Sequence, residues 1–473
     1  MTAVIVVGAG PAGVVAAVRA KELGADTTLV TRGEFGGMAA NDGPVPVRTL
    51  AHAARLIREA RQHGRYGITG SEPRLDYPRL LARVREVVDD VRRHSLRREY
   101  VDSLGVRLHE HVGTARFVDP HTIATESGLQ LRADRIILCA GGTSRRLPVP
   151  GFELTTTHTA AWTLTEVPPS MLVVGGGATG VQVASIFDAF GSRVELFEAG
   201  PRILPTEDED VSAAVATAFR SSGMQVRESF GAIESFEKTP SGVRLVFSKD
   251  GYVDEAEAAV VVVAVGWLAD TAGLNLTAAG VEADSRGYVR VDSHLRTSAP
   301  HIFAAGDITG RLMLVPQAIH DGYVAATNAV RGATATLGDR VSPIGSFTDP
   351  EYAQVGLTEA KARETYDVVV EVVRLDTTTR TIIDGRPTGF CKMIADRATR
   401  TILGCHVVGE RAVEIVQVVA IAMAAGMRVD DLARVPLSFP TYAGVIGRVA
   451  YRAARALGID VGWRAHEVED GAQ

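Results

Sequence analysis

Two short glycine-rich turns constrain this chain more than any other feature, because each stands between an apolar strand-like run and a helical pattern. AVIVVGAGPAG opens the chain, and MLVVGGGATG repeats the GxGxxG spacing later. The glycines concerned are Gly8, Gly10, Gly13, Gly175, Gly177 and Gly180. In this setting the first glycine permits a tight turn, the second lets a pyrophosphate approach the backbone, and the third lets helix and strand pack closely. The chain is therefore predicted to be an α/β protein with two Rossmann-like dinucleotide-binding units.

The two units differ at the end of the strand that follows each turn, where an acid usually binds ribose hydroxyls. In the second unit VELFE ends at Glu198, about twenty residues beyond the glycines, as expected for binding a ribose 2′-hydroxyl. An acid there repels a 2′-phosphate, so NADH is favoured, although the nearby Arg202 leaves NADPH possible. In the first unit TTLVT ends at Thr31, which can bond a hydroxyl but matches the pattern less well.

The rest of the chain predicts a third unit and a second ligand contact. PHIFAAGDITG carries Asp307 after an apolar strand and small residues, so its carboxylate can approach a ligand closely. From about residue 341, short strands alternate with helices, which predicts an α+β unit. The expected ranges are 1–150 and 272–340 for the first nucleotide-binding unit, 151–271 for the second, 341–460 for the C-terminal unit and 461–473 for a polar tail.

Composition and charge exclude several classes of protein. The formal net charge is −6 and no long basic run occurs, so nucleic acid is not an expected partner. No apolar run reaches the ~18 residues of a membrane span. The first strand begins at Ala3, which leaves no room for a signal peptide, so we expect a cytoplasmic protein. The three cysteines, Cys139, Cys391 and Cys405, are far apart in sequence and predict neither a metal site nor a CxxC pair.

Taken together, the two glycine turns, the AAGD segment and the C-terminal pattern resemble the pyridine nucleotide–disulfide oxidoreductases. The segments GTARFVDPHTI and FPTYAGVIGRVA bring the chain nearest to soluble pyridine nucleotide transhydrogenase and to cysteine-poor quinone reductases of the dihydrolipoamide dehydrogenase type. The resemblance implies FAD in the first unit, NADH or NADPH in the second, and a C-terminal dimerisation domain that makes a homodimer.

The resemblance fails at the family's redox machinery. The motif GGTCLNVGCIPSK reads GGMAANDGPVPVR here, so Ala39 and Pro44 replace the two cysteines. A disulfide needs two thiols, and neither residue supplies one. The motif HPTxxE reads FPTYAG, so Phe439 and Gly444 replace the proton-donating histidine and its glutamate. Electron transfer to a disulfide is therefore not expected.

Further changes surround the expected flavin. The family's lysine and glutamate beside the flavin are Arg48 and Gln182 here. An arginine stays charged and presents a fixed fork of donors, so an uncompensated positive charge should favour the reduced, anionic flavin. The bulky residue that often covers the nicotinamide pocket is Ala178, which should leave that side more open. From the partner subunit, Phe439 and Tyr442 are expected to wall the acceptor pocket, and Tyr442 is the one nearby proton donor that the sequence suggests.

These interpretations predict an FAD-dependent NAD(P)H oxidoreductase that passes electrons directly to a small organic acceptor of quinone type. Two alternatives are a soluble NAD(P) transhydrogenase and an FAD enzyme of specialised metabolism, including oxidase or redox-neutral chemistry. The residues expected to act in catalysis are Arg48, Gln182, Phe439 and Tyr442, and no metal site is expected. Those expected at FAD are Gly8, Gly10, Ala12, Gly13, Thr31, Gly37, Arg48, Ala140, Gly141, Gly306, Asp307, Leu314 and Ala318, and those at NAD(P)H are Gly175, Gly177, Ala178, Gly180, Glu198 and Gly266.

Overall fold

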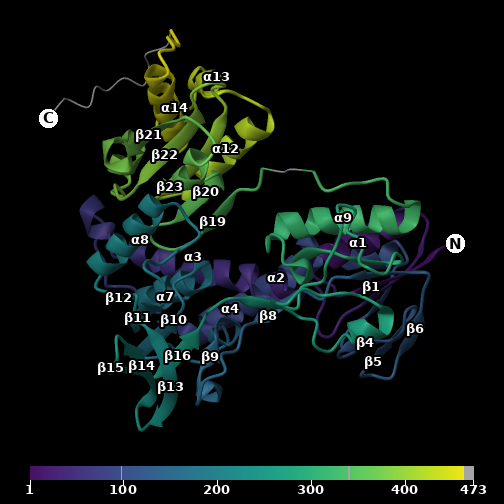
Figure 1. The fold of residues 1–473 in the computed structure, drawn as a ribbon. Coiled ribbons are helices and arrows are strands. Elements are labelled where there is room, and N and C mark those ends of the chain that lie inside the picture. Colours follow the sequence, from purple (N-terminus) through teal and green to yellow (C-terminus); the bar gives the residue numbers. More distant parts are fainter. Residues whose placement is uncertain (97, 339–340, 463–473) are drawn as a thin grey trace.

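A computed structural model describes residues 1–96, 98–338 and 341–462, and it folds into three units (Figure 1). Two contain parallel five-stranded sheets and the third an antiparallel one. This confirms the predicted α/β class with a C-terminal α+β unit. Of the predicted tail 461–473, Val461 is buried in the C-terminal core, and residues 463–473 lie outside the described residues.

The first unit is built on a parallel sheet with strand order β18–β7–β1–β2–β3. Its strands are β1 (Ala3–Val7), β2 (Asp26–Val30), β3 (Arg107–His109), β7 (Arg135–Leu138) and β18 (Ile302–Ala304). Helices α1 (Pro11–Glu22) and α9 (Val315–Arg331) pack side by side on one face (Figure 1). A small antiparallel sheet of β4 (Ala115–Asp119), β5 (Thr122–Thr125) and β6 (Gln130–Arg132) adjoins it. Because β18 follows the second unit in sequence, the chain returns to complete the first sheet.

The second unit repeats the design with strand order β12–β11–β10–β16–β9. Its elements are β9 (Thr156–Thr157), β10 (Ser170–Val174), α7 (Ala178–Phe190), β11 (Arg193–Glu198), α8 (Glu209–Ser221), β12 (Gln225–Glu228) and β16 (Val260–Val263). An antiparallel sheet of β13 (Ala232–Thr239), β14 (Gly242–Lys249) and β15 (Tyr252–Ala258) packs beside it. The apolar run 256–266 is shared between the end of β15 and the whole of β16.

The C-terminal unit has an antiparallel sheet with strand order β19–β20–β23–β22–β21. The strands are β19 (Ile344–Ser346), β20 (Tyr352–Gly356), β21 (Val368–Arg374), β22 (Phe390–Asp396) and β23 (Ile402–Val408). Its helices are α10 (Glu359–Arg363), α11 (Thr379–Ile383), α12 (Ala412–Ala424), α13 (Val429–Ala433) and α14 (Gly444–Ala456). Every residue of β23 is buried, which explains its unbroken apolar character.

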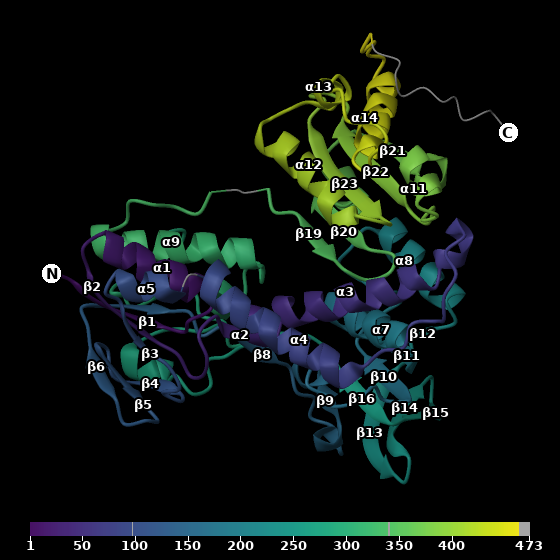
Figure 2. The ribbon, with the colours of Figure 1, turned by 180° about the vertical axis from the view of Figure 1, so that it is seen from behind.

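A helical segment leaves the first unit and runs along the second (Figure 2). It comprises α2 (Gly37–Asn41), α3 (Pro44–Ala60), α4 (Tyr77–Asp90), the π-helix η2 (Val91–Ser95) and α5 (Arg98–Ser103). One face of α3 is apolar: Leu50 and Ala51 are buried in the same core as Val181 and Ala184 of α7. Among the described residues, no helix is long and apolar enough to cross a bilayer.

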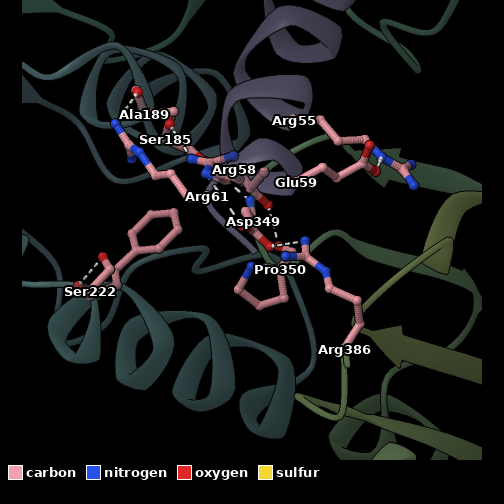
Figure 3. A network of polar contacts seen from close by, with 12 residues as sticks. Arg55, Arg58, Glu59, Arg61, Ser185, Ala189, Ser222, Asp349, Pro350 and Arg386 are labelled. Carbon is pink, nitrogen blue, oxygen red and sulfur yellow. Dashed lines mark hydrogen bonds and ion pairs between the residues drawn. The ribbon is translucent and has the colours of Figure 1, made fainter. Parts of the chain in front are cut away.

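The polar face of α3 is fixed by arginines that reach both the second and the C-terminal units (Figure 3). Arg58 donates to the carbonyl oxygen of Ser185 in α7 and pairs with Asp349 at 3.3 Å. Asp349 also accepts from Arg386 at 2.8 Å, and its backbone N–H donates to the Ser185 hydroxyl. Three parts of the chain therefore meet at Asp349, two through its carboxylate and one through its backbone N–H, and these contacts hold α3 in place.

A second tie joins the second unit to the C-terminal unit around one buried lysine. Nζ of Lys392 in β22 lies 2.9 Å from Asp208, 2.7 Å from Asp210 and 2.6 Å from Glu359. Burial opposes the charge, but hydrogen bonds to these carboxylates hold the pKa of Lys392 above its usual range. Removing the lysine would leave the buried Asp208 carboxylate without its counter-charge, a change that typically costs about 3–5 kcal/mol.

Candidate active site

A cleft of ≈ 1080 Å³ starts at the first glycine turn and ends between the two nucleotide-binding units. It passes the ends of β1 and β2, the α2–α3 turn and the start of α9. At its far end it meets α6 (His158–Ala161) and the two-stranded ribbon of β8 (Gly142–Ser144) and β17 (Trp267–Ala269), which joins the units. Because residues of both units line the cleft, an extended ligand bound in it would contact both units.

The glycine turn at its start has a backbone that only glycine allows. Gly8 has φ +106°, and a Cβ atom there would lie 2.1 Å from the carbonyl oxygen of Cys139. A Cβ on Gly13 would lie 1.7 Å from the carbonyl oxygen of Gly8, so α1 packs directly against the turn. Gly37 has φ +56°, and its Cβ would lie 2.6 Å from Cα of Gly10. Backbone atoms therefore form the floor here, as a pyrophosphate requires.

The middle of the cleft offers polar groups with free bonding capacity. Asp307, in the 3₁₀ turn Gly306–Thr309, makes no side-chain hydrogen bond to any described residue. Burial and the neighbouring Asp321 raise the pKa of Asp307 above its ordinary value. Thr31 is buried at the end of β2 and also lines the cleft. An acceptor and a hydroxyl at these places fit the ribitol and ribose hydroxyls of FAD.

The second glycine turn has the same backbone geometry but lies outside this cleft. Gly175 has φ +109°, and a Cβ on Gly180 would lie 1.8 Å from the carbonyl oxygen of Gly175. The Glu198 carboxylate accepts from the backbone N–H groups of Gly176 and Gly200, both at 2.7 Å. Arg202 donates instead to the carbonyl oxygens of Pro205 and Glu207. Glu198 therefore lies at the second glycine turn, while Arg202 is hydrogen-bonded within its own loop.

The comparisons with known proteins agree with this geometry. Residues 2–322 match the family model "Pyridine nucleotide-disulphide oxidoreductase", and residues 342–450 match the dimerisation domain of the same family. The chain belongs to this family. It carries an FAD-binding unit, an NAD(P)H-binding unit and a dimerisation domain, so it is an FAD-dependent NAD(P)H oxidoreductase.

Relatives and solved structures give the same result. The chain is 32% identical to dihydrolipoyl dehydrogenase 2 of Haloarcula marismortui over 466 residues, covering 95% of this chain and 96% of the relative. It is 31% identical to mercuric reductase of Bacillus cereus over 431 residues, covering 90% of this chain and 68% of the relative. It superimposes on the flavoprotein disulfide reductase RclA of Escherichia coli with a TM-score of 0.85 at 25% identity, covering 95% of this chain and 99% of that one. LpdA of Mycobacterium tuberculosis gives 0.85 at 26% identity, with coverage of 96% and 99%.

Most of the residues predicted at FAD line the cleft. They are Gly8, Gly10, Ala12, Thr31, Gly37, Arg48, Ala140, Gly141, Gly306, Asp307 and Ala318. Two others lie just outside it, since Gly13 supports the turn from below and Leu314 is the N-cap of α9. The residues predicted at NAD(P)H, namely Gly175, Gly177, Ala178, Gly180, Glu198 and Gly266, also lie outside. Of α7, Thr179 and Gln182 reach the cleft.

No described cysteine lines the cleft at the position of the family's disulfide. Ala39 and Pro44 both line the cleft, on either side of the α2–α3 turn. Cys139 also borders the cleft but is buried beneath the glycine turn, and burial raises the pKa of its thiol. Cys391 and Cys405, distant in sequence, have their sulfurs 3.9 Å apart, yet both are buried in the C-terminal sheet. No described group of three or more His, Cys, Asp or Glu residues is arranged to hold a metal ion.

The structure brings Arg48 and Gln182 together, as the sequence predicts. The Arg48 guanidinium donates to Oε1 of Gln182 at 2.8 Å, and the Gln182 amide donates to the carbonyl oxygen of Ala178 at 3.1 Å. Phe347, from the C-terminal unit, lies under the guanidinium, with Cζ 3.3 Å from the ring centroid. Burial lowers the pKa of Arg48 to about 10, which leaves it protonated at neutral pH. Sequence reasoning missed Phe347 because it is some 300 residues away along the chain.

A polar cavity of ≈ 290 Å³ lies behind Arg48, on the side away from the cleft. Arginines and acids of α3 and of the C-terminal unit line it, among them Arg55, Glu351 and Glu410. Burial and the charge of Glu410 raise the pKa of Glu351 to about 7. Arg48 therefore separates the cofactor cleft from a charged interior region.

His158 is another group of the cleft that the sequence did not single out. It is buried, its Nδ1 lies 3.4 Å from the Ser144 hydroxyl, and its ring meets Trp267 edge to face. Burial lowers the pKa of His158 to about 4. The imidazole is therefore neutral at pH 7, so it can orient a ligand but carries no charge toward it.

Phe439 and Tyr442 lie in the dimerisation domain, and within one chain they do not reach the cleft. Phe439 is 80% exposed, whereas the Tyr442 hydroxyl donates to Asp384 at 2.7 Å. Burial and Asp384 raise the pKa of Tyr442 above its ordinary value. Their predicted place beside a flavin thus depends on a partner subunit, and Tyr442 is a poor proton donor in this geometry.

Proposed function

We propose that this oxidoreductase delivers electrons from NADH to a small conjugated acceptor of quinone type, without a thiol relay. When bound, FAD supplies the two-electron chemistry, being reduced by NAD(P)H and reoxidised by the acceptor. The observation that carries the proposal is the wall of the cleft at Ala39 and Pro44, which offers apolar surface where the family has its disulfide.

The other residues of this region support the same interpretation. Arg48 brings a permanent positive charge to the end of the cleft, and Gln182 bonds it without neutralising it. A positive charge favours a reduced, anionic flavin and an acceptor that gains negative charge. Glu198, placed at the second glycine turn, favours NADH because a carboxylate repels a 2′-phosphate.

The test is anaerobic reduction with NADH, followed by mixing with a 1,4-naphthoquinone, ferricyanide, NADP⁺ or dioxygen in separate experiments. Rapid reoxidation of the flavin by the quinone is expected. The variant Cys139→Ala/Cys391→Ala/Cys405→Ala should retain the quinone rate per bound FAD, because no thiol takes part. Loss of that rate with FAD still bound, or reoxidation by NADP⁺ but not by quinone, would contradict the proposal, and the second result would favour the transhydrogenase alternative.

A further inference from the structure

The turn between α2 and α3 carries an acid at the place from which the family's thiols are missing. Asp42 follows the last residue of α2, two positions before Pro44, and lines the cleft with Ala39, Gly43 and Arg48. Its backbone is fixed, since the N–H groups of Asp42 and Gly43 both donate to the carbonyl oxygen of Met38, at 3.0 and 2.8 Å. The backbone of Asp42 is thus fixed on the part of the cleft wall that Ala39 and Pro44 form.

The Asp42 side chain has no partner within the described chain. No hydrogen bond or ion pair joins its carboxylate to any described residue, whereas the nearby Glu34 lies 3.5 Å from Arg92 and 3.4 Å from His111. Asp42 is an exposed residue that lines the cleft. An acid left unpaired in a fixed turn at a ligand site is available to a ligand.

Two features of its surroundings act on its pKa in opposite directions. Although the residue as a whole is exposed, partial burial of the carboxyl raises the pKa of Asp42, and the charge of Arg92 in η2 partly offsets this. The other charged groups on the elements around it are Glu34, on the loop before α2, and Arg48, on α3. Both lie on the cleft wall, so their charges oppose each other at this site.

Three other groups that could give a proton are poorly placed for an acceptor at this turn. The Tyr442 hydroxyl is already donated to Asp384. His158 is a neutral imidazole, and Glu351 lies in the separate cavity behind Arg48. The family's histidine is replaced by Phe439. An acceptor of quinone type takes up two protons for each pair of electrons. One arrives with the hydride, and a positioned acid speeds delivery of the other.

We propose that Asp42 is the proton donor to the acceptor. This rests on the proposed function. NADH is oxidised, and the acceptor gains two electrons and one hydrogen through the cofactor, which leaves a hydroquinone monoanion. The O–H bond of Asp42 then breaks, an O–H bond forms on the anionic oxygen, and the resulting carboxylate regains its proton from water. Arg48, on the same wall, stabilises the anion before the proton arrives.

The first experiment compares wild type with Asp42→Asn in reoxidation by a 1,4-naphthoquinone, which consumes protons, and by ferricyanide, which takes electrons alone. General acid catalysis typically contributes on the order of 100-fold or more, so the quinone-to-ferricyanide rate ratio should fall by about that factor. Asp42→Glu should restore part of it. The matched control is Asp89→Asn, which removes an acid that pairs with Arg92 but lies outside the cleft.

The second experiment measures binding rather than turnover. The Kd of 1-tetralone, an aromatic ketone chosen because it is much harder to reduce than a quinone, is followed by perturbation of the flavin spectrum from pH 5 to pH 9. A protonated Asp42 donates to the ketone oxygen, so affinity should weaken as pH rises through the Asp42 pKa in wild type and stay flat in Asp42→Asn.

The outcomes separate the two proposals. If wild type reduces the quinone and Asp42→Asn keeps both the rate ratio and the pH-dependent Kd, the role of Asp42 is overturned while the function stands. If wild type passes electrons to ferricyanide but not to quinones, the proposed function itself is overturned, and the role of Asp42 with it.

Discussion

The two glycine turns of this protein share a backbone and differ in the residue at the end of the next strand. Gly8 and Gly175 have φ values of +106° and +109°, and a Cβ on the third glycine of either turn would lie under 2 Å from a carbonyl oxygen, at 1.7 Å and 1.8 Å. Beyond the turns, one strand leads to Thr31 and the other ends at Glu198. The glycine turn therefore creates a dinucleotide-binding site, whereas the residue at the end of the next strand selects which nucleotide binds.

The cleft adds a second contrast between the units. The first turn opens into a long cavity that continues to Arg48 and α6, while the second lies outside it, with its acid bonded to its own N–H groups. A cofactor that stays bound needs many contacts, and a nucleotide that must leave needs fewer. Four predictions test this comparison, in order of expected effect.

The largest effect should come from alanine at the third glycine of each turn. In Gly13→Ala the Cβ clash with the Gly8 carbonyl should cost about 3 kcal/mol, or roughly 100-fold in FAD affinity. Gly180→Ala should still bind FAD, but the rate at which NADH reduces the flavin should fall by a similar factor. Flavin content and stopped-flow reduction rates measure the two losses. Equal loss of FAD in both variants would mean that the units do not work separately.

The next effect concerns Glu198. Removing a charged acceptor of a ribose hydroxyl typically costs about 1.5–3 kcal/mol, so Glu198→Ala should raise the Kd of NADH by roughly 10- to 100-fold. The affinity for NADPH should fall less than the affinity for NADH, because the substitution also removes the repulsion of the 2′-phosphate. The control is Glu195→Ala on the same strand, whose carboxylate pairs with Arg227. If the ratio of the NADPH Kd to the NADH Kd is unchanged in Glu198→Ala, then Glu198 only holds its own loop and does not select the nucleotide.

A smaller effect is expected where the two units touch, at Arg48 and Gln182. A unit charge about 4 Å from the flavin is worth roughly 4 kcal/mol at an intermediate dielectric. With screening we expect about 1–2 kcal/mol, a midpoint shift on the order of 20 to 45 mV. Both Arg48→Gln and Gln182→Glu should lower the potential of bound FAD, the first by losing the charge and the second by pairing it. Redox titrations that show unchanged or higher potentials in both variants would exclude this role for Arg48.

The smallest effect should be that of Thr31. Its hydroxyl is a neutral group among many contacts, so Thr31→Ala should weaken FAD binding by about 1 kcal/mol or less. Equilibrium FAD titration of the apoprotein measures the change. A loss as large as that of NADH in Glu198→Ala would show that the first unit depends on its strand end as much as the second, which would remove the contrast.

Local patterns were sufficient to predict the parts of the site that lie within one strand–turn–helix unit. The glycine turns, Asp307 and the alternating C-terminal elements follow from short-range rules, and Arg48 and Gln182 pair as the resemblance implies. Contacts between segments that are distant in sequence could not be predicted from these local patterns. Phe347 under Arg48 and the close sulfurs of Cys391 and Cys405 depend on how units and strands pack. Asp42 was overlooked because a lone acid in a turn has no periodic signal.

The buried Lys392 cluster and the arginines of α3 have a mechanical consequence. They fasten α3, the second unit and the C-terminal unit into one block, and the α2–α3 turn and the β8–β17 ribbon are two of the places where the first sheet joins that block. A rotation of the first sheet against the block would therefore be felt at both joints. Because Asp42 and Gly43 form one joint and Trp267 belongs to the other, any such flexing would move side chains of the cleft itself.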